Sequence, residues 1–221
     1  MQPQETVILL HGLNRTHRSF SKMEHSLIGS GYTVVNVNYP SQHFSIESLV
    51  AGYLAPIISA CKTQSNPKLH FVTHSMGGIL LRYYLQHHTI ANLGNVVMLG
   101  PPNQGSEVVD KLKNVPGFKL INGPAGQQLG TTSTSLPQQL GPVDYPVGVI
   151  AGNRSINPIL SCIIPGENDG KVSLKCARVK GMLDFLVVPY THTMLMSRQR
   201  VIEQTMYFLK HSQFESVTNT T

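Results

Sequence analysis

Stretches that are apolar on both faces alternate along this chain with stretches whose apolar residues recur at helical spacing. Residues 5–11 (Glu-Thr-Val-Ile-Leu-Leu-His) are typical of a buried strand. Further strands are predicted at 32–39, 69–74, 95–100, 147–152 and 183–188. Alternating strands and helices with short links indicate an α/β protein with a mostly parallel sheet of about six strands and helices on both faces.

Apolar positions three and four residues apart predict the main helices. These helices cover 17–29, 45–58, 76–88 and 194–210. Ser45 is a favourable N-cap for the second of them, and Pro56 should kink it. The segment 101–145 differs, because it is rich in Pro, Gly, Ser, Thr and Gln and only 106–112 looks helical. A segment of this length without strong periodicity is usually functional or mobile.

Composition limits the class of protein. Of the 221 residues, 41% are apolar and 13% are charged, which is typical of one globular domain spanning 1–221. No stretch approaches the roughly 18 apolar residues of a membrane span. The first residues carry no basic region ahead of a long apolar run, so a cytoplasmic protein is expected. Three cysteines without zinc-type spacing indicate neither a disulfide framework nor a metal site.

The formal net charge is +6, and the basic residues are spread along the chain. The densest cluster comprises Lys171, Lys175, Arg178 and Lys180. It is either a solvated face or a surface with weak attraction for an anionic membrane or an acidic substrate. No aromatic platform or recognised motif indicates nucleic-acid binding.

Candidate chemistry begins at residues 73–78, Thr-His-Ser-Met-Gly-Gly, which join a predicted strand to a predicted helix. A serine on such a turn has the layout of a nucleophile elbow, with Ser75 above the carboxyl edge of the sheet. Gly77 supplies the small residue that crowded backbones need there. Thr73 stands where the G-x-S-x-G pattern has glycine, so the match is partial.

A nucleophilic serine needs a base, and the base needs an acid that orients it. His192 follows the sixth strand and therefore lies at the same sheet edge as Ser75. Asp169 follows the fifth strand, and the order Ser75, Asp169, His192 is that of the α/β-hydrolase triad. Glu167 and Asp110 remain alternatives for the acid.

The oxyanion of a tetrahedral intermediate needs two donors. Met76, after the serine, offers one main-chain N–H. The loop after the first strand, His11-Gly12-Leu13-Asn14, offers the second through Leu13, because Gly12 lets the chain turn sharply.

In these features the whole chain resembles the α/β-hydrolase superfamily, and its small lipase and esterase branch in particular. The marks are 10–13, 73–78, 102–106, 168–172 and 191–193. The resemblance implies a minimal version of the fold, with 101–145 as a lid-like or pocket-lining insertion. It also implies that Asn103 borders an acyl pocket.

These expectations describe a serine hydrolase that cleaves carboxylic esters through an acyl-enzyme and needs no cofactor. Its substrate would be an acyl ester or lipid, with His11, Gly12, Asn14, Asn103 and Met194 near the bound molecule. A thioesterase or acyltransferase could use the same residues, and a non-catalytic binding protein could share the fold. A dinucleotide site is excluded, because the turn after the first strand lacks the G-x-G-x-x-G cradle.

Overall fold

The computed structural model describes residues 4–61, 67–156 and 164–216, and its centre is a six-stranded sheet. The strands are β1 (Thr6–Leu10), β2 (Thr33–Val37), β3 (Leu69–His74), β4 (Leu93–Leu99), β5 (Val147–Gly152) and β6 (Asp184–Val188). Their order is β2-β1-β3-β4-β5-β6, and every neighbouring pair is parallel. The predicted α/β fold class is confirmed, and the sheet is wholly rather than mostly parallel.

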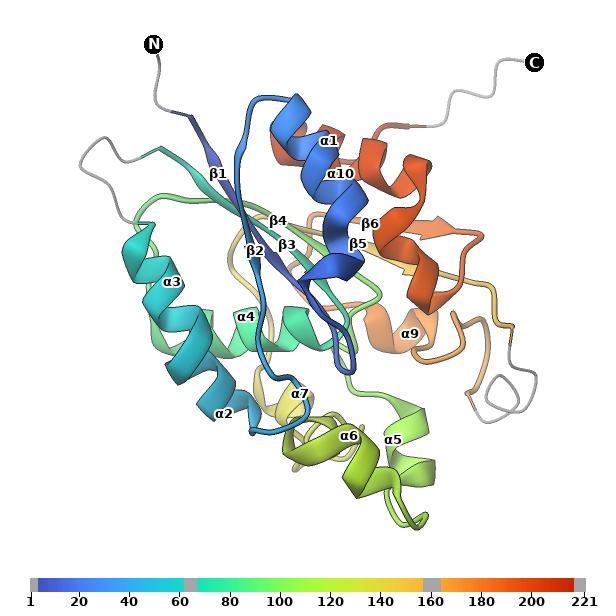
Figure 1. The fold of residues 1–221 in the computed structure, drawn as a ribbon. Coiled ribbons are helices and arrows are strands. Elements are labelled where there is room, and N and C mark those ends of the chain that lie inside the picture. Colours follow the sequence, from blue (N-terminus) through green and yellow to red (C-terminus); the bar gives the residue numbers. More distant parts are fainter. Residues whose placement is uncertain (1–3, 62–66, 157–163, 217–221) are drawn as a thin grey trace, which may run out of the picture.

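Helices cover both faces of the sheet (Figure 1). On one face lie α1 (Ser21–Gly29), which follows a 3₁₀ turn η1 (His17–Phe20), and α10 (Gln199–His211). The opposite face carries α2 (Ile46–Leu49), α3 (Ala55–Ala60), α4 (Met76–His87) and the short α9 (Leu174–Ala177). Along β1, Val7 and Leu9 pack in the first layer and Ile8 and Leu10 in the second, as the two-residue period of a strand requires.

Two predicted helices are interrupted in the structure. Ser45 caps α2, because its hydroxyl accepts the Ser48 N–H at 3.3 Å. Between α2 and α3 lies a π turn, η2 (Val50–Leu54), and Pro56 falls at the start of α3, directly after this turn. The helix predicted at 194–210 begins as a separate 3₁₀ turn, η3 (His192–Ser197), and Arg198 is extended before α10 starts.

The segment 101–145 contains more helix than its sequence suggested. Besides α5 (Glu107–Leu112), it forms α6 (Phe118–Gln127) and α7 (Leu136–Gln139). The prediction that only 106–112 is helical was therefore incomplete. In α6 the helical pattern is hidden, because Gly123 breaks it at φ 61° and Leu120 is 87% exposed.

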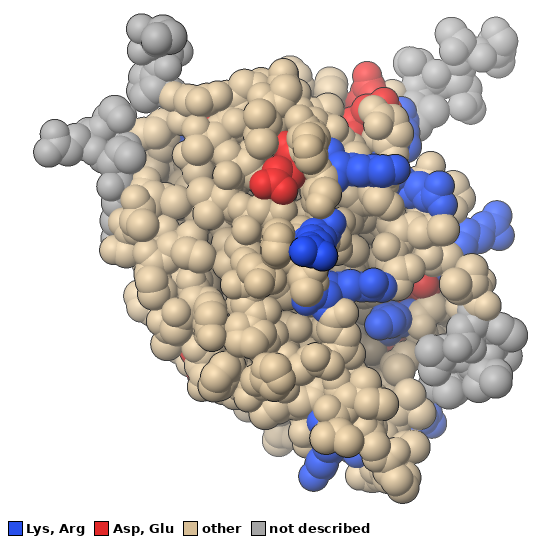
Figure 2. Space-filling model, in the orientation of Figure 1, with Lys and Arg blue, Asp and Glu red and all other residues tan. Residues whose placement is uncertain are grey.

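Charge is unevenly distributed over the surface. In Figure 2, lysine and arginine side chains gather on the side of the molecule that carries α1 and α10, whereas much of the opposite side carries none. Among the described helices, none is both long and apolar enough to cross a membrane.

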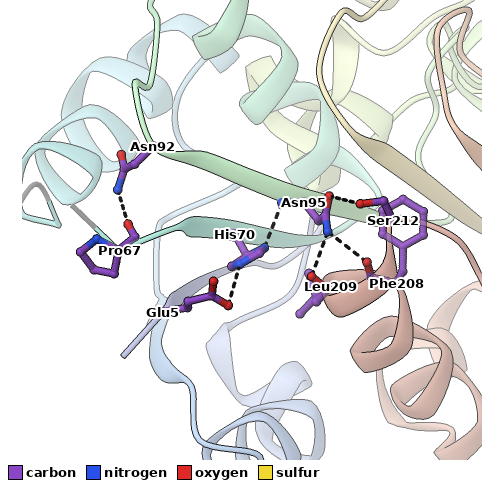
Figure 3. Close-up of polar contacts among 8 residues, drawn as sticks. All are labelled: Glu5, Pro67, His70, Asn92, Asn95, Phe208, Leu209 and Ser212. Atoms are coloured by element: carbon purple, nitrogen blue, oxygen red, sulfur yellow. Dashed lines mark hydrogen bonds and ion pairs between the residues drawn. The ribbon is translucent and has the colours of Figure 1, made fainter. Parts of the chain in front are cut away.

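A buried polar chain at the amino end of the sheet joins β1, β3 and β4 to α10 (Figure 3). His70 Nδ1 accepts the Asn95 N–H at 2.9 Å, and His70 Nε2 lies 3.3 Å from a Glu5 carboxylate oxygen. The Asn95 amide donates to the carbonyls of Phe208 and Leu209 at 3.2 and 2.8 Å. Because Nδ1 accepts, the proton of the neutral ring is on Nε2. Burial lowers the pKa of His70 from 6.5, and Glu5 opposes this shift only in part.

Stability should therefore fall as the solution is acidified. The unfolded chain protonates His70 near its ordinary pKa of 6.5, whereas the folded chain does so only at lower pH. The contribution of the neutral ring is full above pH 6.5 and is lost as the pH falls from there through the folded pKa, by about 1.4 kcal/mol per pH unit. His11 and His74, whose pKa values burial also lowers, add to this slope.

The measurement is the free energy of unfolding in urea between neutral pH and pH ~5. His70→Gln should make the slope shallower, and the exposed His25→Gln is the control. Equal slopes in wild type and His70→Gln would contradict the assignment.

Candidate active site

Ser75 occupies the sharp turn between β3 and α4. Its φ of 53° and ψ of −122° are rare for a residue with a side chain, and such strain is typical of functional turns. The Ser75 N–H donates to the carbonyl of Leu99 at 2.9 Å, so the end of β4 holds the turn. The residue therefore stands at the carboxyl edge of the sheet, on the turn that the sequence pattern predicts.

Two glycines after the serine make this turn possible. A Cβ on Gly77 would lie 2.3 Å from the Leu10 carbonyl oxygen and 2.9 Å from that of His11, so only glycine fits. A Cβ on Gly78 would lie 3.2 Å from the hydroxyl oxygen of Thr73. Thr73, which replaces the glycine of the usual pattern, is thus accommodated because Gly78 leaves it room.

Asp169 and His192 are hydrogen-bonded to each other. His192 Nδ1 lies 2.7 Å from Asp169 Oδ2, and both side chains are buried. The other carboxylate oxygen accepts the N–H groups of Lys171 and Val172 at 3.0 and 2.9 Å, and the His192 N–H donates to the Asp169 carbonyl at 3.0 Å. Since an ionised carboxylate only accepts, Nδ1 carries the proton and Nε2 keeps a lone pair for another partner.

Short contacts connect this pair to the serine turn. A Cβ on Gly100, the residue after β4, would lie 3.0 Å from Asp169 Oδ2 and 3.1 Å from His192 Nδ1. His74, the neighbour of Ser75, bonds the His192 carbonyl through Nε2 at 3.0 Å. Within the described residues, no hydrogen bond joins the Ser75 hydroxyl to the His192 ring. Catalytic hydrogen bonds often align fully only in a complex with substrate.

The two alternative acids are engaged elsewhere. Glu167 is exposed and accepts from the Asn153 side chain at 3.1 Å. Asp110 accepts from the main chain and the hydroxyl of Thr131 at 3.0 and 2.6 Å. Of the three candidates, Asp169 is the one that contacts His192.

The loop after β1 lies against the serine turn. A Cβ on Gly12 would be 3.1 Å from the Ser75 Cβ, so this glycine permits close approach. In the part of the chain that is described, the N–H groups of Leu13 and Met76 donate no hydrogen bond, which leaves both for an incoming oxygen. Asn14 adopts φ 57°, and its N–H and side chain bond Ser41 and Asn122, both at 3.2 Å.

His11 lies beneath this loop. Its ring is fully buried and stacks on Tyr39 with the ring centroids 4.0 Å apart. Nδ1 bonds the Gly12 carbonyl at 2.9 Å, Nε2 accepts the Tyr39 N–H at 3.4 Å, and the Tyr39 hydroxyl donates to the His11 carbonyl. Both ring nitrogens are thus occupied by main chain, which places His11 as a support of the loop, out of reach of a bound molecule.

His74 is a site residue whose role the sequence did not indicate. Its ring is buried, at 2% exposure. Burial and the nearby His192 lower the pKa of His74 well below its usual value, so the ring is neutral. Its Nε2–H then donates to the His192 carbonyl and holds the loop that carries the base. The only sequence signal was its position beside the serine.

Two further predicted binding residues differ in accessibility. Asn103 is 2% exposed, and its amide donates to the Ala177 carbonyl at 2.9 Å, so it is part of the scaffold beneath the site. Met194 is 37% exposed on η3, in the same turn as His192. A largely apolar cavity of about 180 Å³ is lined by Ser155, Ile156, Asp169, Gly170, Lys171, Thr191, His192 and Thr193.

Nothing in the described ranges groups three or more His, Cys, Asp or Glu side chains in a metal-binding arrangement. The side chains gathered at this edge are instead a strained serine, a buried carboxylate and an imidazole whose Nε2 has no hydrogen-bond partner among the described residues. This arrangement is suited to nucleophilic attack with proton transfer.

Comparison with known proteins places the chain in a family. A sequence model described as "Palmitoyl protein thioesterase" matches residues 6–141, which include the serine turn and the loop after β1. No curated protein sequence matches the chain significantly.

Solved lipase structures share the fold. The propeptide form of Bacillus licheniformis lipase BlEst2 superimposes with a TM-score of 0.74 at 20% identity, over 99% of this chain and 52% of that one. The mature form of the same lipase superimposes with a TM-score of 0.71 at 20% identity, over 95% of this chain and 92% of that one. Aspergillus fumigatus lipase B superimposes with a TM-score of 0.68 at 14% identity, over 94% of this chain and 53% of that one. The chain thus spans about half the length of the propeptide form. With its wholly parallel sheet, its serine turn and its match to the family over most of its length, the chain belongs to the palmitoyl protein thioesterase family and has the α/β-hydrolase fold.

Proposed function

We propose that this protein is a serine hydrolase that cleaves acyl esters and thioesters through an acyl-enzyme. The observation that carries the proposal is the 2.7 Å hydrogen bond between His192 Nδ1 and Asp169 Oδ2 at the sheet edge where Ser75 stands. This bond selects the tautomer in which Nε2 can accept the proton of a serine hydroxyl.

In the proposed reaction the Ser75 oxygen attacks the acyl carbonyl carbon while His192 Nε2 takes the hydroxyl proton. Asp169 stabilises the imidazolium that forms, and the N–H groups of Leu13 and Met76 hold the oxyanion. His192 then gives its proton to the departing alkoxide or thiolate. Water, activated by the same nitrogen, releases the acid and restores the serine.

The surroundings of His192 and the family both indicate the class of substrate. The cavity beside His192 is mostly apolar, and the exposed Ile156 lines it. Met194 is exposed on η3, two residues after His192. Such a rim suits a hydrocarbon acyl chain. The family name points to a thioester and the lipase structures to an oxygen ester, and the proposed mechanism serves both because only the leaving atom differs.

We also propose that 101–145 covers the acyl site. Asn122 on α6 bonds Asn14, and Gln42 donates to the Ile121 carbonyl at 2.7 Å. A Cβ on Gly126 would lie 2.9 Å from the Leu13 side chain. These contacts seat α6 on the loop that offers one oxyanion donor.

The first prediction concerns the nucleophile. A fluorophosphonate probe should label one serine, Ser75, as determined by peptide mapping. Ser75→Ala should abolish labelling, and His192→Ala should slow it by about 10²-fold or more, because the base no longer activates the hydroxyl. Ser197→Ala on η3 is the matched control and should label normally. A folded protein that takes up no probe would overturn the proposal in favour of a binding role.

The second prediction concerns the acid. Asp169→Asn keeps an oxygen for the Lys171 and Val172 N–H groups but turns a donor toward His192, which favours the wrong tautomer. We expect kcat/KM to fall by about 10³–10⁴-fold with little change in Tm. An oxygen ester and a thioester with the same acyl chain serve as paired substrates, and both should be affected. Glu167→Gln is the control, and full activity in Asp169→Asn would disprove the assigned acid.

A further inference from the structure

The helix that begins at the serine turn also carries a buried arginine. Arg82 on α4 is 4% exposed. One terminal nitrogen, Nη1, donates to the main-chain and side-chain oxygens of Asn103 at 2.7 and 3.3 Å, and Nη2 donates to the Gly141 carbonyl at 2.6 Å. All three partners are neutral. Within the described residues, the Nε–H and one Nη2–H of this guanidinium have no acceptor.

No carboxylate neutralises this cation. All 11 acidic residues of the chain lie within the described ranges, and none of them forms an ion pair with Arg82. Burial lowers the pKa of Arg82, and the one nearby group that opposes this shift is the phenol of Tyr145, which is itself neutral. A buried charge is normally paired, because leaving water costs several kcal/mol per ion.

A cavity beside Arg82 gathers further positive charge. It has a volume of about 180 Å³, and Asn103, Gln138 and Gly141 contribute to its wall. Arg178 and Lys180 line it as well, and no acidic residue does. The Arg178 guanidinium lies 3.7 Å above the Phe185 ring centroid, which holds it in a defined position. Two members of the basic cluster noted in the sequence therefore join the buried arginine around one hollow.

We propose that this cavity is a binding site for a phosphoryl group, separate from the serine site. A tetrahedral oxyanion with two negative charges matches two guanidinium forks and an ammonium better than a singly charged carboxylate does. Arg82 lines the cavity, and its Nε–H and second Nη2–H have no acceptor within the described residues. Arg178 and Lys180 supply charge at its rim.

The experiment uses the full chain and inorganic phosphate as the probe, compared with chloride at equal ionic strength. Calorimetric titration should give saturable binding, and phosphate should raise Tm, because a ligand that binds the folded state stabilises it. The double variant Arg178→Gln/Lys180→Gln should weaken binding by about ten-fold or more. These rim residues are chosen because replacing Arg82 would leave three carbonyls unpaired. Unfolding in chloride checks that the variant is folded.

A matched control removes the same charge elsewhere. Lys111→Gln/Lys113→Gln at the end of α5 also deletes two cations. If phosphate were attracted only by the net positive charge, both variants should lose equal affinity for it. A loss confined to the cavity variant supports the site, whereas phosphate binding that is weakened equally in both variants, or unchanged in both, overturns it.

A second arm separates free phosphate from a lipid headgroup. Vesicles containing phosphatidic acid replace inorganic phosphate. If the protein binds these vesicles but not inorganic phosphate, and the Arg178→Gln/Lys180→Gln variant loses this binding, the phosphoryl group belongs to a lipid headgroup. Absence of cavity-dependent binding in both arms would refute the proposal.

Discussion

The close approach of α4 to the end of β1 is the constraint on which the candidate site depends. Gly77 lies so near the Leu10 and His11 carbonyls that any side chain would push the helix away. That contact sets the height of Ser75 above the sheet and its distance from the loop that begins at Gly12. The strained conformation of Ser75 and the tight loop after β1 therefore depend on each other, because each is held in place by contact with the other.

Hydrogen bonds, most of them to main-chain groups, hold the candidate acid and base in place. The Asp169 carboxylate receives two N–H groups on one oxygen and the imidazole on the other, so its orientation leaves little freedom. His74 fixes the carbonyl of His192, and Tyr39 fixes that of His11. Donors and acceptors arranged in advance need not reorganise when charge develops, which is the main source of electrostatic stabilisation in enzymes.

The same helix that positions the serine also anchors the segment 101–145. Arg82 binds Asn103 near the start of that segment and Gly141 near its end, so both ends are tied to α4. Between these ends, α6 reaches the loop after β1 through Asn122. A stretch with weak periodicity is thereby held over the edge of the sheet where the serine lies. A guanidinium can do this because its donors point in several directions at once.

The sequence by itself predicted about six strands in a mostly parallel sheet, the serine turn and the order of the candidate acid and base. These features follow from local periodicity and from the rule that loops after parallel strands meet at one edge. Strand bounds such as Leu69–His74 agree closely with the pattern, because buried strands are apolar on both faces.

Only the tertiary structure decided which polar side chains serve the main chain. The local sequence does not indicate that Asn103 and His11 are buried. It also does not indicate that His74 bonds the His192 carbonyl, or that Arg82 forms no ion pair with an acidic residue. The sequence also did not reveal helix α6, because Gly123 interrupts its pattern and two of its apolar residues, Leu120 and Ile121, are exposed. These contacts join residues from different elements, which in the case of His74 and His192 are 118 positions apart, and local propensity carries no information about them.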